Sequence, residues 1–111
     1  MKTSIKATNL DVTPSLKTFI DSKLKNLEKL VKKFDSEGAV MLHLEIARTT
    51  KHHHKGDVFM AEANLNLPGK TLRAVDKNKD IRTAIDNMRK ILQREIEKYK
   101  TQNSPGRPRK K

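Results

Sequence analysis

The sequence predicts an α+β domain in which two helices pack on one face of a four-stranded sheet. Two long segments, one towards each end of the chain, repeat apolar residues at three- and four-residue steps, the spacing of an amphipathic helix. Four shorter segments are typical of strands, and two of them alternate apolar with polar residues. One-sided helices and a one-sided sheet cover each other in a two-layer sandwich, with the order β-α-β-β-β-α.

The first strand is expected at "TSIKATN" (3–9), and the first helix follows "DVTPSL". Thr13 can cap this helix, and Pro14 suits its first position because the missing N–H would have no partner there. The sequence "DSEG" (35–38) is expected to end it, with Gly38 free to adopt a positive φ. Between these ends, about five turns carry one apolar stripe, formed by Leu16, Phe19, Ile20, Leu24, Leu27, Val31 and Phe34.

Three further strands are predicted in the middle of the chain. In "AVMLHLEIA" (39–47) the residues alternate, and "DVFMAEANLNL" (57–67) alternates in the same way from Phe59 onwards. Pro68-Gly69 is a turn signal, and "KTLRAVD" (70–76) is the fourth strand. The inward sets are expected to be Val40, Leu42, Leu44 and Ile46 in one strand, and Phe59, Ala61, Ala63, Leu65 and Leu67 in the next.

The second helix is predicted over residues 79–100. Asp76 or Asn78 is expected to cap it, and Asp80 lies in its first turn, close to the positive end of the helix dipole. Its apolar stripe consists of Ile81, Ala84, Ile85, Met88, Leu92, Ile96 and Tyr99.

The chain is strongly basic, with a formal net charge of +12 over 111 residues. Residues 103–111, "NSPGRPRKK", hold four basic and no acidic residues, and are expected to be a disordered tail that adds nonspecific attraction to RNA. The other 102 residues hold 21 basic and 13 acidic residues, so the predicted domain (1–102) is itself positive. This charge indicates a polyanion partner, with nucleic acid ahead of an anionic membrane.

The sequence lacks features that membrane-spanning, secreted and disulfide-bonded proteins require. No apolar run approaches the roughly 20 residues that span a bilayer, and the first ten residues do not resemble a secretory signal. There is no cysteine, so neither a disulfide framework nor a cysteine-based zinc site is available. These features favour a cytoplasmic protein without a membrane partner.

Basic residues four apart stand out in the second helix. Lys90, Arg94 and Lys98 lie above one another on a helix, where like charges repel and cost a few tenths of a kcal/mol for each pair. A solvated face kept charged for solubility is one explanation, and a face that binds phosphates is the other. Among the side chains off the apolar stripe, seven are basic and two are acidic. These side chains are Lys79, Arg82, Asp86, Arg89, Lys90, Arg94, Glu97, Lys98 and Lys100.

The few aromatic residues limit the type of nucleic acid that would be bound. Phe19, Phe34 and Tyr99 fall on the apolar stripes, and Phe59 is expected to point inwards. The paired exposed aromatics on which sheet-based RNA binders stack bases are therefore missing. Basic helices on a sheet are better suited to recognising RNA shape and backbone than to reading bases.

An enzyme or a metal site has little support in the sequence. No phosphate-binding glycine loop and no nucleophile–base pair is recognisable, so we expect no catalysis and no cofactor. Glu45, Glu62 and Asp57 are the strand-region carboxylates from which a metal-dependent nuclease would be built. Three neighbouring histidines in one loop are expected to decorate that loop rather than to bind metal; they are His52, His53 and His54.

The two helical segments resemble a known family. "LDVTPSLKTFIDSKLKNLEK" (10–29) and "KDIRTAIDNMRKILQREIEKYK" (79–100) are similar to the two helices of ribosome hibernation promoting factors and ribosome-associated inhibitor proteins, and the resemblance covers about residues 3–100. The matching positions are Val12, Thr13, Leu16, Phe19, Lys23, Leu27 and Glu28 in the first segment, and Asp80, Ala84, Ile85, Asp86, Arg94, Lys98, Tyr99 and Lys100 in the second. Three positions depart from the family pattern: Asn26, Arg82 and Ile91.

The resemblance implies a monomeric binding protein that occupies the decoding region of the small ribosomal subunit, excludes tRNA and mRNA, and keeps ribosomes inactive. As a short form, it would not be expected to pair two ribosomes by itself. A general RNA- or DNA-binding module without ribosome specificity is the alternative. The residues that the resemblance and the charge pattern assign to 16S rRNA are Lys23, Lys79, Arg82, Arg89, Lys90, Arg94 and Lys98.

Overall fold

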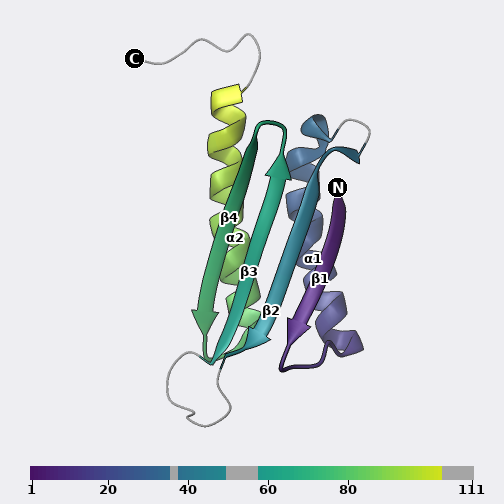
Figure 1. Cartoon of the computed structure of the whole chain (residues 1–111), viewed down its shortest axis with the longest axis vertical. Coiled ribbons are helices and arrows are strands. Elements are labelled where there is room, and N and C mark those ends of the chain that lie inside the picture. The colour runs from purple at the N-terminus through teal and green to yellow at the C-terminus, as the bar shows by residue number, and fades with distance from the viewer. Residues whose placement is uncertain (36–37, 50–57, 104–111) are drawn as a thin grey trace.

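The predicted sandwich is confirmed by a computed structural model, which describes residues 1–35, 38–49 and 58–103. The elements are β1 (Lys2–Thr8), α1 (Pro14–Val31), a short 3₁₀ turn η1 (Lys32–Phe34), β2 (Met41–Arg48), β3 (Phe59–Leu67), β4 (Lys70–Asn78) and α2 (Ile81–Asn103). Both helices lie behind the sheet in Figure 1, so one face of the sheet is covered and the other is open. No helix in these described ranges is long and apolar enough to span a membrane.

The four strands follow the order of the chain across the sheet. β1 runs parallel to β2, and the β2–β3 and β3–β4 pairs are antiparallel. α1 makes the connection between the two parallel strands, as such a pair requires a crossover. The tight hairpin between β3 and β4 is the predicted Pro68-Gly69 turn, in which Gly69 adopts a φ of 77°.

The core lies between the helices and the covered face of the sheet. Register places Leu42, Leu65 and Leu72 side by side on three strands, and Leu44, Ala63 and Ala74 form the next row. The small residues of β3 and β4 lie beneath α2, which packs closely on these two strands. From the helices, the core receives Leu16, Ile20, Leu24, Leu27 and Val31 of α1, and Ala84, Ile85, Met88, Leu92, Ile96 and Tyr99 of α2.

The start of α2 differs from the sequence prediction. β4 continues to Asn78 because it stays paired with the first residues of β3, so Asp76 and Asn78 belong to the strand, and Asn78 Oδ1 accepts from the Asp80 backbone N–H at 3.2 Å, before the helix begins. Asp80 is the cap: its carboxylate accepts hydrogen bonds from the Thr83 backbone N–H at 3.2 Å and from the Thr83 hydroxyl at 2.8 Å. These bonds from Thr83 hold the pKa of Asp80 below its usual value.

Three aromatic side chains are less buried than the sequence predicted: Phe19, Phe34 and Phe59. Phe19 is only half-buried where α1 meets α2, and Phe59 is half-buried at the end of β3, with the Arg48 guanidinium 5.9 Å from its ring centroid. Phe34 and Tyr99 pack edge to face, with their ring centroids 4.9 Å apart, and the Tyr99 hydroxyl donates to the Pro68 carbonyl at 2.7 Å. This last bond ties the C-terminal half of α2 to the β3–β4 hairpin.

The cap of α2 can be tested by the substitution Asp80→Ala. We expect the free energy of unfolding to fall by about 1 kcal/mol, because the first-turn N–H groups lose their acceptor. Since the pKa of Asp80 is lowered in the folded state, its contribution is present above the unfolded pKa. The deficit should therefore be full at neutral pH and shrink as the pH falls below about 4. Urea unfolding at several pH values measures it, with the exposed Asp11→Ala as the control.

Candidate nucleic-acid interface

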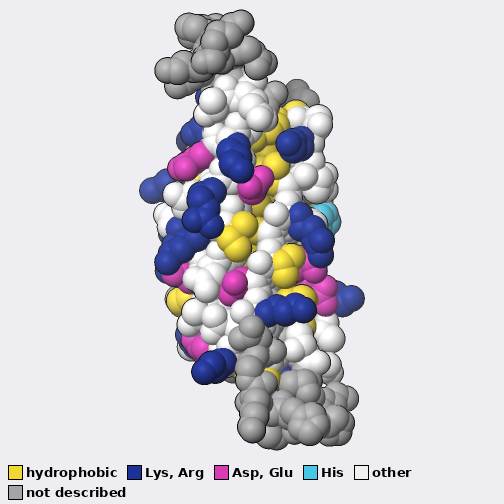
Figure 2. Space-filling model, turned by 90° about the vertical axis from the view of Figure 1, so that its left-hand side faces the viewer, with side chains coloured by type: hydrophobic (Ala, Val, Ile, Leu, Met, Phe, Trp, Pro, Cys, Tyr) yellow, Lys and Arg dark blue, Asp and Glu magenta, His cyan; other side chains and the backbone are white. Residues whose placement is uncertain are grey.

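The stripe predicted on the second helix lies on the exposed side of α2. The Lys90 and Lys98 side chains are 58% and 72% exposed, and Arg94 between them is exposed as well. At 1.5 Å per residue, Lys90 and Lys98 are about 12 Å apart along the helix. Figure 2, which views the β4–α2 edge of the molecule, shows Lys and Arg side chains gathered along its left-hand side. This arrangement can present several cations to one phosphate backbone.

Carboxylates lie near two of the three cations of the stripe, Asp86 near Lys90 and Glu95 near Lys98. Lys98 is 3.5 Å from Glu95, an exposed ion pair one turn apart. Within the described residues, Arg94 has no carboxylate oxygen within 4.0 Å, so Glu97, three residues further along the helix, is not its partner. Exposed pairs of this kind contribute little and exchange readily for other anions.

A second group of charged side chains lies where α1 meets α2, and we call it the junction cluster. It consists of three cations around one carboxylate: Lys23, Arg89 and Lys90 around Asp86. Asp86 Oδ1 accepts from Arg89 Nη2 at 2.7 Å and lies 3.2 Å from Lys23 Nζ on the other helix. Asp86 Oδ2 is 3.6 Å from Lys90 Nζ. The hydrogen bond from Arg89, together with the Lys23 ammonium, keeps the pKa of Asp86 below its usual value although partial burial opposes this. The cluster thus combines three positive charges with one negative charge.

Phe19 extends the cluster along the junction. The Arg82 guanidinium is 5.3 Å from its ring centroid and the Lys23 ammonium is 5.2 Å from it, both within cation–π range. Arg82 Nη2 also donates to the Ser15 hydroxyl at 2.7 Å, a contact between the N-terminal turns of the two helices. Phe19 therefore holds two of the predicted binding residues in place, a role that its position on the apolar stripe did not reveal.

The structure brings most of the predicted binding residues together, though not all of them. Lys23, Arg82, Arg89 and Lys90 meet around Asp86 and Phe19, and the last of these cations begins the stripe on α2. Lys79 is exposed just before α2, at the opposite end of the helix from Lys98. Sequence reasoning missed Ser15 and Gln93 as anchors, since isolated neutral polar residues on a helix carry no distinctive pattern.

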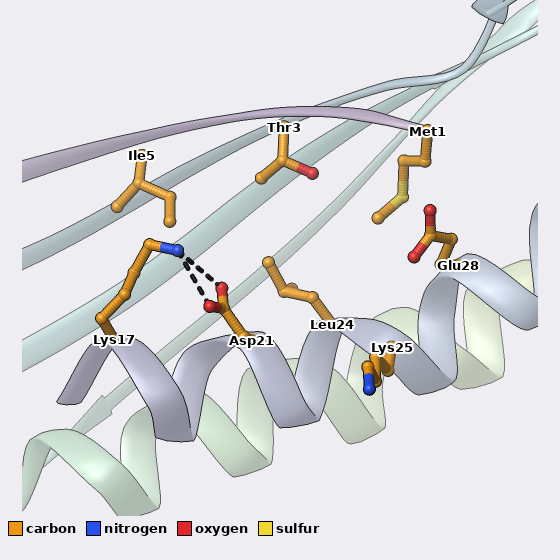
Figure 3. Close-up of a pocket in the computed structure, with 8 residues that line it drawn as sticks. All are labelled: Met1, Thr3, Ile5, Lys17, Asp21, Leu24, Lys25 and Glu28. Carbon is orange, nitrogen blue, oxygen red and sulfur yellow. Dashed lines mark hydrogen bonds and ion pairs between the residues drawn. The ribbon is translucent and has the colours of Figure 1, made fainter. Parts of the chain in front are cut away.

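A groove of about 590 Å³ runs between β1 and α1, away from the cations of α2. Figure 3 shows Ile5 and Leu24 facing each other across it, while Lys17 and Asp21 bond to one another at 2.9 Å. The opposite charges of this pair cancel within the wall of the groove. Nothing in this lining resembles a nucleophile–base pair or an anion site.

The residues considered for a nuclease have ordinary structural partners. Glu45 and Glu62 lie opposite each other in the β2–β3 register, on the open face of the sheet. Glu62 accepts from Arg73 at 2.8 Å, and Glu45 accepts from the Thr8 hydroxyl at 3.1 Å. In residues 1–35, 38–49 and 58–103, no group of three or more His, Cys, Asp or Glu side chains could hold a metal ion. Asp57, His52, His53 and His54 lie outside the described residues, as does the basic tail beyond Asn103.

Comparison with known protein families identifies the chain. Residues 3–104 match the family model described as "Sigma 54 modulation protein / S30EA ribosomal protein". The chain belongs to this family. The match includes both helices and all four strands, and it confirms the family resemblance seen in the two helical segments.

Relatives and solved structures agree with this assignment. The chain is 28% identical over 104 residues to the ribosome hibernation promotion factor of Deinococcus radiodurans, and 29% identical over 101 residues to that of Lactococcus lactis. It covers about half of these two relatives, 51% and 50% of their lengths, with 90% and 91% of its own. The ribosome hibernation promoting factor of Klebsiella oxytoca is 28% identical over 100 residues, which are 90% of this chain and 94% of that protein.

The fold is also found in solved structures. The N-terminal domain of Protein Y from Thermus thermophilus superposes with a TM-score of 0.69 at 20% identity, over 89% of this chain and 99% of that one. A ribosomal subunit interface protein from Coxiella burnetii gives a TM-score of 0.60 at 21% identity, over 86% and 96%. At these identities, the likeness supports the fold alone.

Two substitutions in α1 compare the contribution of the junction cluster to stability with that of the core. Lys23→Met should change the free energy of unfolding by less than about 1 kcal/mol, since a partly exposed ion pair contributes little. Leu27→Ala, one turn further along, should cost about 2–5 kcal/mol, because this side chain is fully buried. Urea denaturation measures both. Equal losses would show that Lys23 is needed for folding rather than available for a ligand.

Proposed function

We propose that the chain is a ribosome-binding translation inhibitor that occupies the decoding region of the small ribosomal subunit. In this proposal the basic sides of α1 and α2 contact phosphates of 16S rRNA, and the bound protein blocks tRNA and mRNA. Ribosomes are thereby kept in an inactive, hibernating state. The protein acts in the cytoplasm as a monomer when free, without catalysis.

The observation that carries the proposal is the continuous set of cations on one side of the molecule in a member of this family. The junction cluster and the α2 stripe supply Lys23, Arg89, Lys90, Arg94 and Lys98, with Arg82 beside Phe19 and Lys79 just before α2. The names of the relatives, ribosome hibernation promotion factor and ribosomal subunit interface protein, connect the family to the ribosome. Basic side chains without an exposed pair of aromatic rings suit contacts to an RNA backbone.

A general RNA- or DNA-binding module is the second candidate. The basic surface alone favours it as much as the first, because phosphate contacts carry no sequence information. The two functions differ in what is bound: one saturable site on the small subunit, or any duplex with comparable affinity.

Co-sedimentation with purified ribosomes and separated subunits tests the proposal. We expect stoichiometric binding to the small subunit that tRNA displaces. The triple substitution Lys90→Glu, Arg94→Glu and Lys98→Glu should abolish binding at moderate salt, because three charges are reversed and the net charge of the interface falls by six units.

The matched control changes three exposed lysines on the open face of the sheet: Lys2→Glu, Lys6→Glu and Lys77→Glu. It alters the net charge by the same amount and should retain the greater part of the binding, provided that circular dichroism shows both variants folded. If both triple variants lose binding equally, net charge rather than the α2 stripe governs it. If wild-type protein prefers no subunit over random RNA, the general binding module is the better function.

Salt should weaken the complex steeply. About five neutralised phosphates predict a slope near −4 in a plot of the logarithm of affinity against the logarithm of salt concentration. The α2 stripe supplies three of these contacts, so the single substitution Arg94→Gln should reduce the slope by about 1. Affinities measured between 50 and 200 mM KCl give the slope, and a slope near zero would argue against phosphate contacts.

A further inference from the structure

One carboxylate holds the cations of the junction cluster in place. Asp86 is the shared partner of Arg89, Lys23 and Lys90, at 2.7, 3.2 and 3.6 Å, and its side chain is 26% exposed. Two of these partners come from its own helix and one comes from α1. Without Asp86, three like charges would lie close together with no anion between them.

Arg89 and Lys23 each have a second anchor besides Asp86, so their positions are well determined. Arg89 Nη1 donates to Gln93 Oε1 at 2.8 Å, and the Lys23 ammonium lies over the Phe19 ring. Arg89 is only 15% exposed, and its Nε is buried without a hydrogen-bond partner in the described residues. A buried guanidinium is costly when its counter-ion is removed, so Arg89 would move or draw in another anion if Asp86 were neutral.

For attraction to a polyanion as such, Asp86 is unfavourable. It subtracts one charge from a basic region of the surface, and its neutralisation would strengthen the attraction to any RNA. Asp86 must therefore contribute through the positions in which it holds the neighbouring cations. Cations fixed in one arrangement lose less freedom on binding a backbone of matching shape, and they fit other backbones less well.

We propose that Asp86 is a positioning residue that determines specificity: it fixes Lys23, Arg89 and Lys90 in the arrangement that fits the small-subunit rRNA, and it lowers affinity for other RNA. This inference rests on the proposed ribosomal function and adds to it a residue that touches no RNA phosphate itself. It implies that one substitution should change specific and nonspecific affinity in opposite directions, which neither a purely structural role nor a purely electrostatic role would do.

The test is Asp86→Asn, which keeps the shape of the side chain and removes its charge. Affinities are measured for purified small subunits and for a random-sequence RNA duplex at one salt concentration. We expect binding to the small subunit to weaken about tenfold, the size of coupling found among residues in one charged network. Binding to the random duplex should strengthen about twofold, because one repulsive charge is lost. The ratio of the two affinities should thus fall about 20-fold.

Asp21→Asn is the matched control. It also removes one surface carboxylate charge, but Asp21 lies on the side of α1 that faces β1, is half-exposed and pairs with Lys17 at 2.9 Å, outside the junction cluster. Both affinities should rise together in this variant, and their ratio should stay as in the wild type. Asp86→Glu keeps the charge and should recover a large part of the lost ratio.

If Asp86→Asn does not fold, the double variant Lys23→Gln with Asp86→Asn replaces it, since it removes one charge of each sign and relieves the repulsion. Its ratio should lie well below that of the wild type. The inference is overturned if the wild type discriminates between the two RNAs and the variants with Asp86→Asn discriminate equally well. A wild type that binds both RNAs alike overturns the proposed function itself, an outcome visible before any variant is made.

Discussion

Burial of a single apolar sheet face is the constraint on which the rest of the structure depends. Four strands present one apolar side, and the chain has two helices with which to cover it. Both helices must therefore lie on the same side of the sheet, next to each other, as Figure 1 shows. The polar sides of α1 and α2 then form one continuous outer surface. Cations that are distant in sequence, such as Lys23 and Lys90, meet there as a consequence of core packing.

The same constraint explains how far the sequence allows prediction. Alternation in 39–47 and 57–67 and the stripes on both helices predict the element order, the covered face and the buried residues, because burial leaves a period in the sequence. The cap of α2 was predicted wrongly, at Asp76 or Asn78, because strand pairing with β3 extends β4 by two residues. Long-range pairing of this kind leaves no local signal, so Asp80 took the role instead.

The candidate site could be predicted only in part, for a related reason. The cations of α2 share a period with the helix, so Lys90, Arg94 and Lys98 were recognisable as a stripe. What surrounds Asp86 depends on where α1 crosses α2, and no spacing in the sequence encodes the 3.2 Å contact between Lys23 and Asp86. Phe19 was predicted to be buried because it follows the apolar period. It lies instead at the edge of the stripe, where one side of the ring is in contact with Arg82.

The two parts of the basic surface differ in how their repulsion is relieved, and this difference suggests separate tasks. On the exposed stripe the like charges are screened by water and salt, and they remain mobile enough to follow a backbone of any shape. In the junction cluster Lys23 and Arg89 are partly buried and a carboxylate compensates them, so these two cations are held in place before a ligand arrives. Mobile cations add affinity for any polyanion, whereas fixed cations add affinity only for a ligand that matches their arrangement. A protein that must recognise one RNA shape among many similar backbones needs both, and the sharing of Lys90 between the cluster and the stripe joins the two at the centre of α2.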